Sequence, residues 1–222
     1  MHYKQDAAAT EKDSGLLSYF DDIVRDNKLA PAVLVAALSA CATETVLLNS
    51  ERIERRFGSY GIDVLASEAG LRRSSLYSAS GESRICRTYA VVRFTAEPDK
   101  SYSPEHTKVL AGNSLGEVFR ANGWKIHKQT LHIGSLDMGA GNSSIVKLMN
   151  LSENRSLALH IYQLLLAKGD RIFEYAMIVE AHHPDYLSES DLLDIYRYTE
   201  SESLSAGYLA ELGGLIINNR NE

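Results

Sequence analysis

The sequence predicts one α+β domain in which helices flank an antiparallel β-sheet. Two observations favour this fold class. After Gly61 the spacing of apolar residues changes from the helical period of about 3.6 to the strand period of 2. Two turn sequences, at 79–82 and 168–170, each separate a pair of strand-like segments. The chain has 222 residues, 45% of them hydrophobic, and neither a repeat nor a second linker divides it, so one unit is expected.

The N-terminal part is predicted to be helical. Residues 1–14 are polar and rich in alanine and are expected to form a flexible lead-in, so the domain is assigned to residues 15–222. Pro31 and Ser50 occupy positions where helices commonly begin. Apolar residues at helical spacing place helices over 14–25, 31–42 and 50–60.

The central part is predicted to form the sheet. The first strand-like segment begins over 62–65, and the others cover 71–78, 85–94, 124–133, 157–166 and 170–181. The segment 85–94 is rich in β-branched and aromatic residues. Short helices are expected over 104–111 and 114–122, with Ser114 as the N-cap of the second. The glycine-rich segment 134–144 is expected to be a loop. Two helices, over 188–198 and 203–217, complete the prediction.

Composition and motifs disfavour several classes of protein. The net charge of -6 leaves no basic excess to bind a phosphate backbone, so no nucleic-acid partner is expected. Cys41 and Cys86 are far apart and match no metal-binding or disulfide pattern. The longest apolar run, 29–42, is interrupted by Pro31 and is too short to cross a membrane. We therefore expect a cytoplasmic protein with no membrane partner.

Three charged residues within apolar strands are the candidates for a site. Arg73, Arg87 and Glu174 stand where a charge is costly unless it is paired or bound to a ligand. If the first hairpin brings the two arginines to one side, they form a positive pocket suited to a small carboxylate. An internal ion pair of an arginine with Glu174, or side chains that point to water, accounts for the same pattern.

Other constellations give weaker signals. His182 and His183 are adjacent on an extended segment and point to opposite sides, with no third metal ligand placed by spacing. The loop at 134–144 lacks the lysine and the glycine spacing of nucleotide-binding loops. His160 and Tyr162 share one strand face and are interpreted as core or rim residues. Cys86 is interpreted as a packed, unreactive thiol.

Several short segments resemble the chorismate lyases and the wider chorismate lyase-like fold, which includes the effector-binding domains of some winged-helix regulators. The resemblance covers about 45–180, and no single segment carries it. The matching segments are Leu48-Asn49-Ser50 with the helix to Phe57, Leu71-Arg72-Arg73, Arg87-Thr88, Leu110, Ser114-Leu115-Gly116, Phe119 and Glu174-Tyr175-Ala176.

The resemblance implies a substrate site and a reaction. Arg73 is expected to bind a substrate carboxylate, Leu115 to offer its backbone N–H, Arg87 to lie beside the same pocket and Glu174 to lie near a ring hydroxyl. Arg73 and Glu174 are then the catalytic pair. The implied reaction releases pyruvate from chorismate, or from a related cyclic acid, and leaves an aromatic product such as 4-hydroxybenzoate, without metal or organic cofactor.

The same fold implies an alternative, a non-catalytic sensor domain that binds a small carboxylate. About 45 residues precede the matching region, fewer than the roughly seventy of a winged-helix domain, and they contain no basic recognition helix. In both hypotheses the partner is a small-molecule carboxylate. Either a monomer or a homodimer is compatible with the sequence, since the helix over 203–217 can pack internally or against a second copy.

Overall fold

In the computed structural model, the described residues are 47–68, 70–95, 98–138, 144–151 and 155–198, with single positions at 22, 32, 36, 39 and 209. The lead-in predicted over 1–14 lies outside them. Apart from those single positions, so do the helices predicted over 14–25, 31–42 and 203–217. The assignment of the domain to residues 15–222 therefore stays a prediction.

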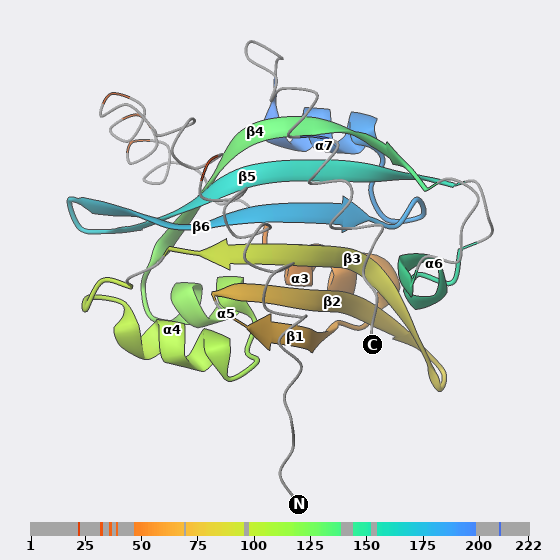
Figure 1. The fold of residues 1–222 in the computed structure, drawn as a ribbon, viewed down its shortest axis with the longest axis horizontal. Helices are drawn as coiled ribbons and strands as arrows, with labels where there is room; N and C mark the ends of the chain where they lie inside the picture. Colours follow the sequence, from red (N-terminus) through yellow and green to blue (C-terminus); the bar gives the residue numbers. More distant parts are fainter. Residues whose placement is uncertain are drawn as a thin grey trace, which may run out of the picture.

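Six antiparallel strands form one sheet, and the predicted α+β class is confirmed. The strands are β1 (Gly61–Glu68), β2 (Leu71–Ser80), β3 (Ser83–Phe94), β4 (Lys125–Asp137), β5 (Ser156–Lys168) and β6 (Arg171–His182). Their order across the sheet is β1-β2-β3-β6-β5-β4 (Figure 1), and every neighbouring pair is antiparallel. The predicted hairpins correspond to β2–β3 and β5–β6.

Five described helices surround the sheet: α3 (Asn49–Phe57), α4 (Ser103–Leu110), α5 (Leu115–Ala121), α6 (Ser144–Leu148) and α7 (Glu189–Tyr196). Figure 1 shows α4 and α5 at one end of the strands and α6 at the other. The bounds of α3 follow from local chemistry. The backbone N–H of Leu48 donates to Glu51 at 2.7 Å, and Gly58 ends the helix at a φ of 78°, a conformation that favours glycine.

Both faces of the sheet are covered. Residues 157–167 of β5 are all buried, as expected for a strand packed on both sides. One face carries a hydrophobic cluster that includes Tyr89, Ile161 and Val179 and extends to α6. The opposite face carries a cluster beneath α4 and α5 and another beneath α3 and α7.

An aromatic cluster fixes α4 and α5 on the sheet. The ring of Phe119 on α5 meets that of Tyr175 on β6 edge to face, with their centroids 4.8 Å apart. Tyr102 makes similar contacts with Phe119, Trp124 and Tyr175. Such pairs contribute about 0.5–1.5 kcal/mol beyond the area they bury. These contacts therefore anchor α5 to the sheet through Phe119.

The prediction of a glycine-rich loop over 134–144 is wrong for the first residues of that range. β4 continues to Asp137, because Gly134 pairs with Leu159 and Leu136 with Leu157 in the ladder with β5. The part of the loop at 139–143 lies outside the described residues.

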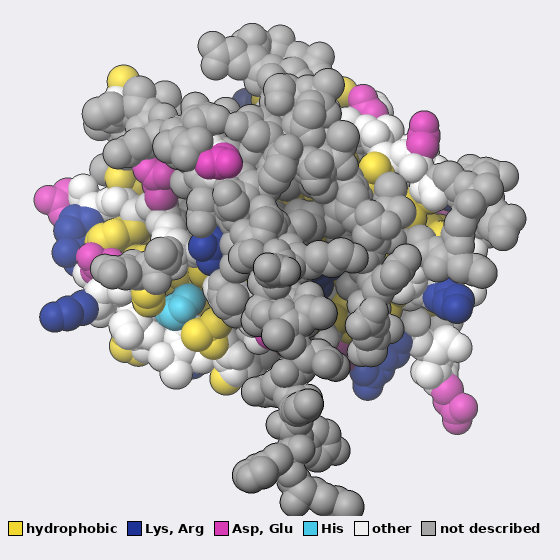
Figure 2. Space-filling view, viewed as in Figure 1, with side chains coloured by type: hydrophobic (Ala, Val, Ile, Leu, Met, Phe, Trp, Pro, Cys, Tyr) yellow, Lys and Arg dark blue, Asp and Glu magenta, His cyan; other side chains and the backbone are white. Residues whose placement is uncertain are grey.

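On the face shown in Figure 2, the described acidic and basic side chains are interspersed along the rim. Within the described ranges, none of the helices is long and apolar enough to span a lipid bilayer.

Candidate functional site

A cavity lies between the middle of the sheet and the N-terminal ends of α3 and α5. The centre of a water molecule can reach about 90 Å³ of it, room for several waters. Side chains from all six strands form its floor. Most of the lining is apolar, contributed by Leu48, Ile62, Leu76, Ala90, Val92, Leu115, Ile126, Leu164 and Ile178. Polar side chains gather at two places, around Arg72 and around Glu180.

Arg72 brings a buried positive charge to the cavity. Its residue is only 3% exposed. Its Nε donates to the Ser74 hydroxyl at 2.9 Å, and its Nη1 donates to the carbonyls of Val109 and Asn113 at 2.8 and 3.1 Å. All three acceptors are neutral, and no carboxylate within the described ranges pairs with this guanidinium. Burial lowers the pKa of Arg72, but an arginine keeps its charge in a protein.

The starts of α3 and α5 close the cavity from above. Leu48 and Leu115 both line it, and Gly116 allows the two chain segments to approach closely. A Cβ at Gly116 would lie 2.8 Å from Cδ2 of Leu48, so a larger residue would force the Leu48 side chain to move. Tyr60 lines the same region, and burial raises its pKa to about 12.

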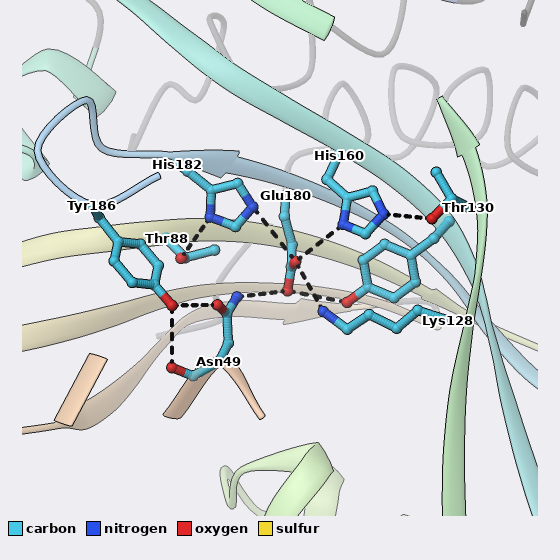
Figure 3. A network of polar contacts seen from close by, with 9 residues as sticks. Asn49, Thr88, Lys128, Thr130, His160, Glu180, His182 and Tyr186 are labelled. Carbon is cyan, nitrogen blue, oxygen red and sulfur yellow. Dashed lines mark hydrogen bonds and ion pairs between the residues drawn. The ribbon is translucent and has the colours of Figure 1, made fainter. Parts of the chain in front are cut away.

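A polar network is centred on Glu180 in β6 (Figure 3). Its Oε1 accepts hydrogen bonds from the Tyr162 hydroxyl at 3.0 Å and from Asn49 Nδ2 at 3.2 Å. Its Oε2 accepts from Lys128 Nζ at 3.3 Å. The Tyr186 hydroxyl donates to Asn49 Oδ1 at 2.6 Å and so fixes the amide. Side chains from β4, β5 and α3 thus converge on one buried carboxylate of β6.

Glu180 and Lys128 are both charged. Burial alone raises the pKa of Glu180, but the Lys128 ammonium and the other donors outweigh it, and the net shift is downward. Burial alone lowers the pKa of Lys128, but Glu180 outweighs it and holds that pKa well above its usual range. The pair is therefore neutral as a unit, and among the described lining residues Arg72 adds one positive charge without a carboxylate partner.

Two histidines flank the carboxylate. His160 Nδ1 lies 4.0 Å and His182 Nε2 3.7 Å from Glu180 Oε2. Burial lowers the pKa of both imidazoles, that of His182 to about 4 and that of His160 well below its usual range. Both rings are therefore neutral near pH 7. Within the described part of the chain, these three side chains form the group whose ligand atoms are close enough to hold a metal ion.

Of the four residues predicted from sequence, Leu115 lines the cavity. Arg73 does not. Arg72 pairs with Val92, which lines the cavity, whereas Arg73 pairs with Val91 in the cluster on the other face. Side chains alternate along a strand, so Arg73 points away from the cavity, toward Tyr89. Burial raises the pKa of Tyr89 more than the neighbouring Arg73 lowers it.

Arg87 and Glu174 are not brought together either. Arg87 stacks over Phe57 at 3.8 Å and donates to the Ser78 hydroxyl. Phe57 ends α3, so this contact lies about 12 Å along the helix from the cavity. Glu174 lies between Phe173 and Tyr175, which both belong to the aromatic cluster, so it faces the opposite side. The expected convergence of Arg73, Arg87 and Glu174 is therefore absent from the cavity.

The charged residues that do line the cavity are Arg72, Lys128 and Glu180. Each is a charged residue within an alternating or apolar segment, as are the predicted Arg73, Arg87 and Glu174. Arg72 belongs to the matching segment Leu71-Arg72-Arg73, one position from Arg73. Glu180 interrupts the apolar run of β6 as Glu174 does, and only the pairing of strands distinguishes them.

The structure also places the other residues that the sequence analysis interprets. Cys86 is a buried free thiol, and burial raises its pKa to about 12, which fits unreactive packing. Tyr162 and His160 are buried, as expected, but both belong to the Glu180 network. His182 faces Glu180, while His183 Nε2 contacts the Met149 carbonyl at 3.0 Å.

Comparison with known proteins identifies no family for this chain. No family model matches the chain, and no curated protein matches its sequence. Among solved structures, it is similar to a transcriptional regulator of the GntR family from Enterococcus faecalis, at 12% identity, over 59% of this chain and 93% of that one. The TM-score is 0.31, which is too low to support any conclusion about function.

Proposed function

We propose that the chain is a ligand-binding domain whose cavity holds a small organic carboxylate. The buried guanidinium of Arg72 carries the proposal. Its hydrogen-bond partners within the described ranges are all neutral. They accept from Nε and Nη1, and Nη2 donates to none of them. Burying an unpaired charge is costly, and an anion in the cavity would supply the missing counter-charge.

The lining also favours a ligand of particular shape. Apolar side chains from β3, β5 and β6 separate Arg72 from the pair formed by Lys128 and Glu180. A compact ligand with an apolar body would fill this middle part. A hydroxyl or similar group at its far end could hydrogen-bond to Glu180. A ring that carries a carboxylate and an opposite hydroxyl, as in 4-hydroxybenzoate, fits this description.

The contribution of Arg72 to affinity is measurable. A hydrogen bond between charged groups contributes about 1.5–3 kcal/mol, and guanidinium binds a carboxylate through two donors. We expect Arg72→Met to weaken carboxylate binding about 10–150-fold. Arg73→Met is the matched control, because it removes the same charge one residue away, on the other face of the sheet.

Calorimetry with 4-hydroxybenzoate, benzoate and the neutral analogue benzamide tests the proposal. The two carboxylates should bind wild type and Arg73→Met alike, and Arg72→Met weakly or not at all. Benzamide should bind poorly to all three proteins, since it carries no charge. Equal binding of benzoate to wild type and Arg72→Met would contradict the proposal.

A second candidate function is a lyase of the chorismate type. It is favoured because an arginine, the start of a helix at Leu115 and a buried glutamate line one cavity, the three kinds of group that the resemblance to chorismate lyases implies. Arg72 and Glu180 would then take the roles expected of Arg73 and Glu174. Chorismate would lose its enolpyruvyl group as pyruvate, while the ring becomes 4-hydroxybenzoate and no other reactant is consumed.

Turnover separates the two candidates. Purified protein is incubated with chorismate, and pyruvate is measured through coupled reduction by lactate dehydrogenase. Release of pyruvate above the uncatalysed rate, lost in Glu180→Gln but retained in Glu174→Gln, would support the lyase. Binding of 4-hydroxybenzoate without pyruvate release would leave the ligand-binding domain as the function.

A further inference from the structure

We propose that His160, Glu180 and His182 form a binding site for one divalent transition-metal ion. This site goes beyond the carboxylate pocket, with which it shares Glu180, and it does not involve Arg72. The inference stands on the positions of the three side chains, on the hydrogen bonds that orient them and on two buried ring nitrogens that have no hydrogen-bond partner among the described residues.

The strand register brings the three ligands together. His160 on β5 pairs directly with Glu180 on β6, and the next position on the same face of β6 is His182. The three ligand atoms lie within 4.8 Å of one another. The contacts with Glu180 Oε2 are 4.0 Å for His160 and 3.7 Å for His182. Tetrahedral ligands about 2.0–2.1 Å from zinc are about 3.4 Å apart, so small side-chain rotations close the site.

Two threonines orient the imidazoles. Thr130 Oγ1 lies 3.0 Å from His160 Nε2, and Thr88 Oγ1 lies 3.0 Å from His182 Nδ1. Each hydroxyl can accept the N–H of the outer nitrogen, which leaves a lone pair on the inner nitrogen. Metal-binding histidines are commonly held by such a second hydrogen bond, which fixes the tautomer and the direction of the ring.

The inner nitrogens have nothing else to bind within the described part of the chain. His160 Nδ1 and His182 Nε2 are both buried without a hydrogen-bond partner there, and the side chains are 0% and 1% exposed. Buried polar atoms are almost always satisfied. Figure 3 shows both rings directed at the carboxylate of Glu180. A metal ion between the three groups would satisfy both nitrogens at once.

The donor set selects the class of metal. Two neutral imidazoles and one carboxylate suit Zn²⁺, Co²⁺, Ni²⁺ or Fe²⁺, whereas Ca²⁺ and Mg²⁺ prefer oxygen ligands. Three protein ligands leave at least one coordination position open. Glu180 lines the cavity, so a molecule bound in the cavity would reach the open coordination position.

Lys128 competes with the metal. Its ammonium lies 3.3 Å from Glu180 Oε2, so a cation already sits beside this oxygen, and a metal ion must displace it. The lysine side chain is 15% exposed and also lines an adjoining hollow beside α7, into which it can withdraw. Removing the lysine charge should therefore strengthen metal binding.

Titration of the 222-residue chain with Co²⁺, after a chelator has removed bound metal, tests the site. We expect one ion per chain and the visible d–d absorption of four- or five-coordinate cobalt. Loss of a residue that hydrogen-bonds to a metal ligand lowers metal affinity about 10–100-fold. Loss of a ligand itself costs more, so His160→Gln and His182→Gln should each lower Co²⁺ affinity about 100-fold or more. Lys128→Met should raise the affinity at least about tenfold, because like charges repel.

Two controls make the result specific. His183→Gln removes a neighbouring buried histidine that contacts Met149 instead of Glu180, and it should leave Co²⁺ affinity unchanged. Arg73→Met, on the other face of the sheet, should also leave it unchanged. Benzoate binding measured in the same histidine variants keeps failure of the metal site distinct from failure of the carboxylate pocket.

X-ray absorption on the Zn²⁺-loaded wild type and Lys128→Met proteins decides the matter even where a histidine variant does not fold. Two imidazole ligands per zinc are expected. Fewer than two, or no bound ion in either protein, would overturn the proposal. Co²⁺ affinity unchanged in folded His160→Gln and His182→Gln would overturn it as well.

Discussion

Lys128→Met tests whether the charge pair holds the site together. The substitution keeps most of the side-chain volume but leaves Glu180 Oε2 without its ammonium, while Asn49 and Tyr162 still donate to Oε1. Removing one partner of a buried ion pair costs about 3–5 kcal/mol. Because Lys128 is 15% exposed and Glu180 7%, we expect the lower end, about 3 kcal/mol. That loss corresponds to a fall in Tm of about 6–12 °C for a chain of this size.

The loss of unfolding free energy in Lys128→Met, called its deficit below, should depend on pH. Burial raises the pKa of Glu180, but in the wild type Lys128 outweighs it and the net shift is downward. Such a carboxylate stabilises the fold above its unfolded pKa of about 4.3, and this stabilisation is lost as the pH falls through the folded pKa. Without Lys128, burial dominates and raises the folded pKa above the unfolded value. The variant then loses stability as the pH rises above about 4.3, so its deficit grows toward pH 7.

Urea unfolding at pH 4.5 and pH 7, in EDTA to keep metal ions away, measures this deficit. The double variant Lys128→Met/Glu180→Gln is the control, because it removes the carboxylate charge too and should recover at least half of the loss at pH 7. A deficit below about 1 kcal/mol, the range of an exposed pair, or one that is equal at both pH values, would refute the reasoning.

Two further predictions concern the elements that support the cavity. Phe119→Ala should destabilise the protein by about 3–5 kcal/mol in urea unfolding, since Phe119 is 0% exposed in the aromatic cluster. Leu110→Ala, at a 47% exposed position, should change stability by about 0.5 kcal/mol or less, and similar values for the two would contradict this packing. In a Cys41→Ser background, Cys86 should react with a thiol reagent only on unfolding, because its thiol is 1% exposed and burial raises its pKa to about 12. Equal rates in buffer and in urea would show that the thiol is accessible.

The elements of the sheet were predictable because their signals are local. Period-2 alternation and two short turns identify β2, β3, β5 and β6 without any knowledge of long-range contacts. The end of β4 was missed because Gly134 lowers strand propensity. Its pairing with Leu159 on β5 overrides that preference, and such pairing is not visible in a single segment.

The cavity was harder to predict because it depends on which face each residue occupies. A shift of one residue moves a side chain to the other side of a strand, and this is the difference between Arg73 and Arg72. Register shifts between Leu76 and Tyr77 and between Leu164 and Leu165 change the phase within single strands. Alternation counted from the sequence cannot detect such shifts.

The histidine and carboxylate group shows the same limit on a longer scale. The sequence indicates His182 as a possible metal ligand, but no spacing in it indicates a third one. The pairing of β5 with β6 places His160 opposite Glu180, across about twenty intervening residues. Partners that meet across a sheet have no characteristic spacing, so only the register shows that they belong together.

A crystal structure with 4-bromobenzoate tests the central claim most directly, since bromine marks the orientation of the ring. The carboxylate should lie against the guanidinium of Arg72, with the ring between β3 and β5 and the bromine toward Glu180. A molecule bound at Arg73 or on the outer surface, with the cavity empty, would contradict the account.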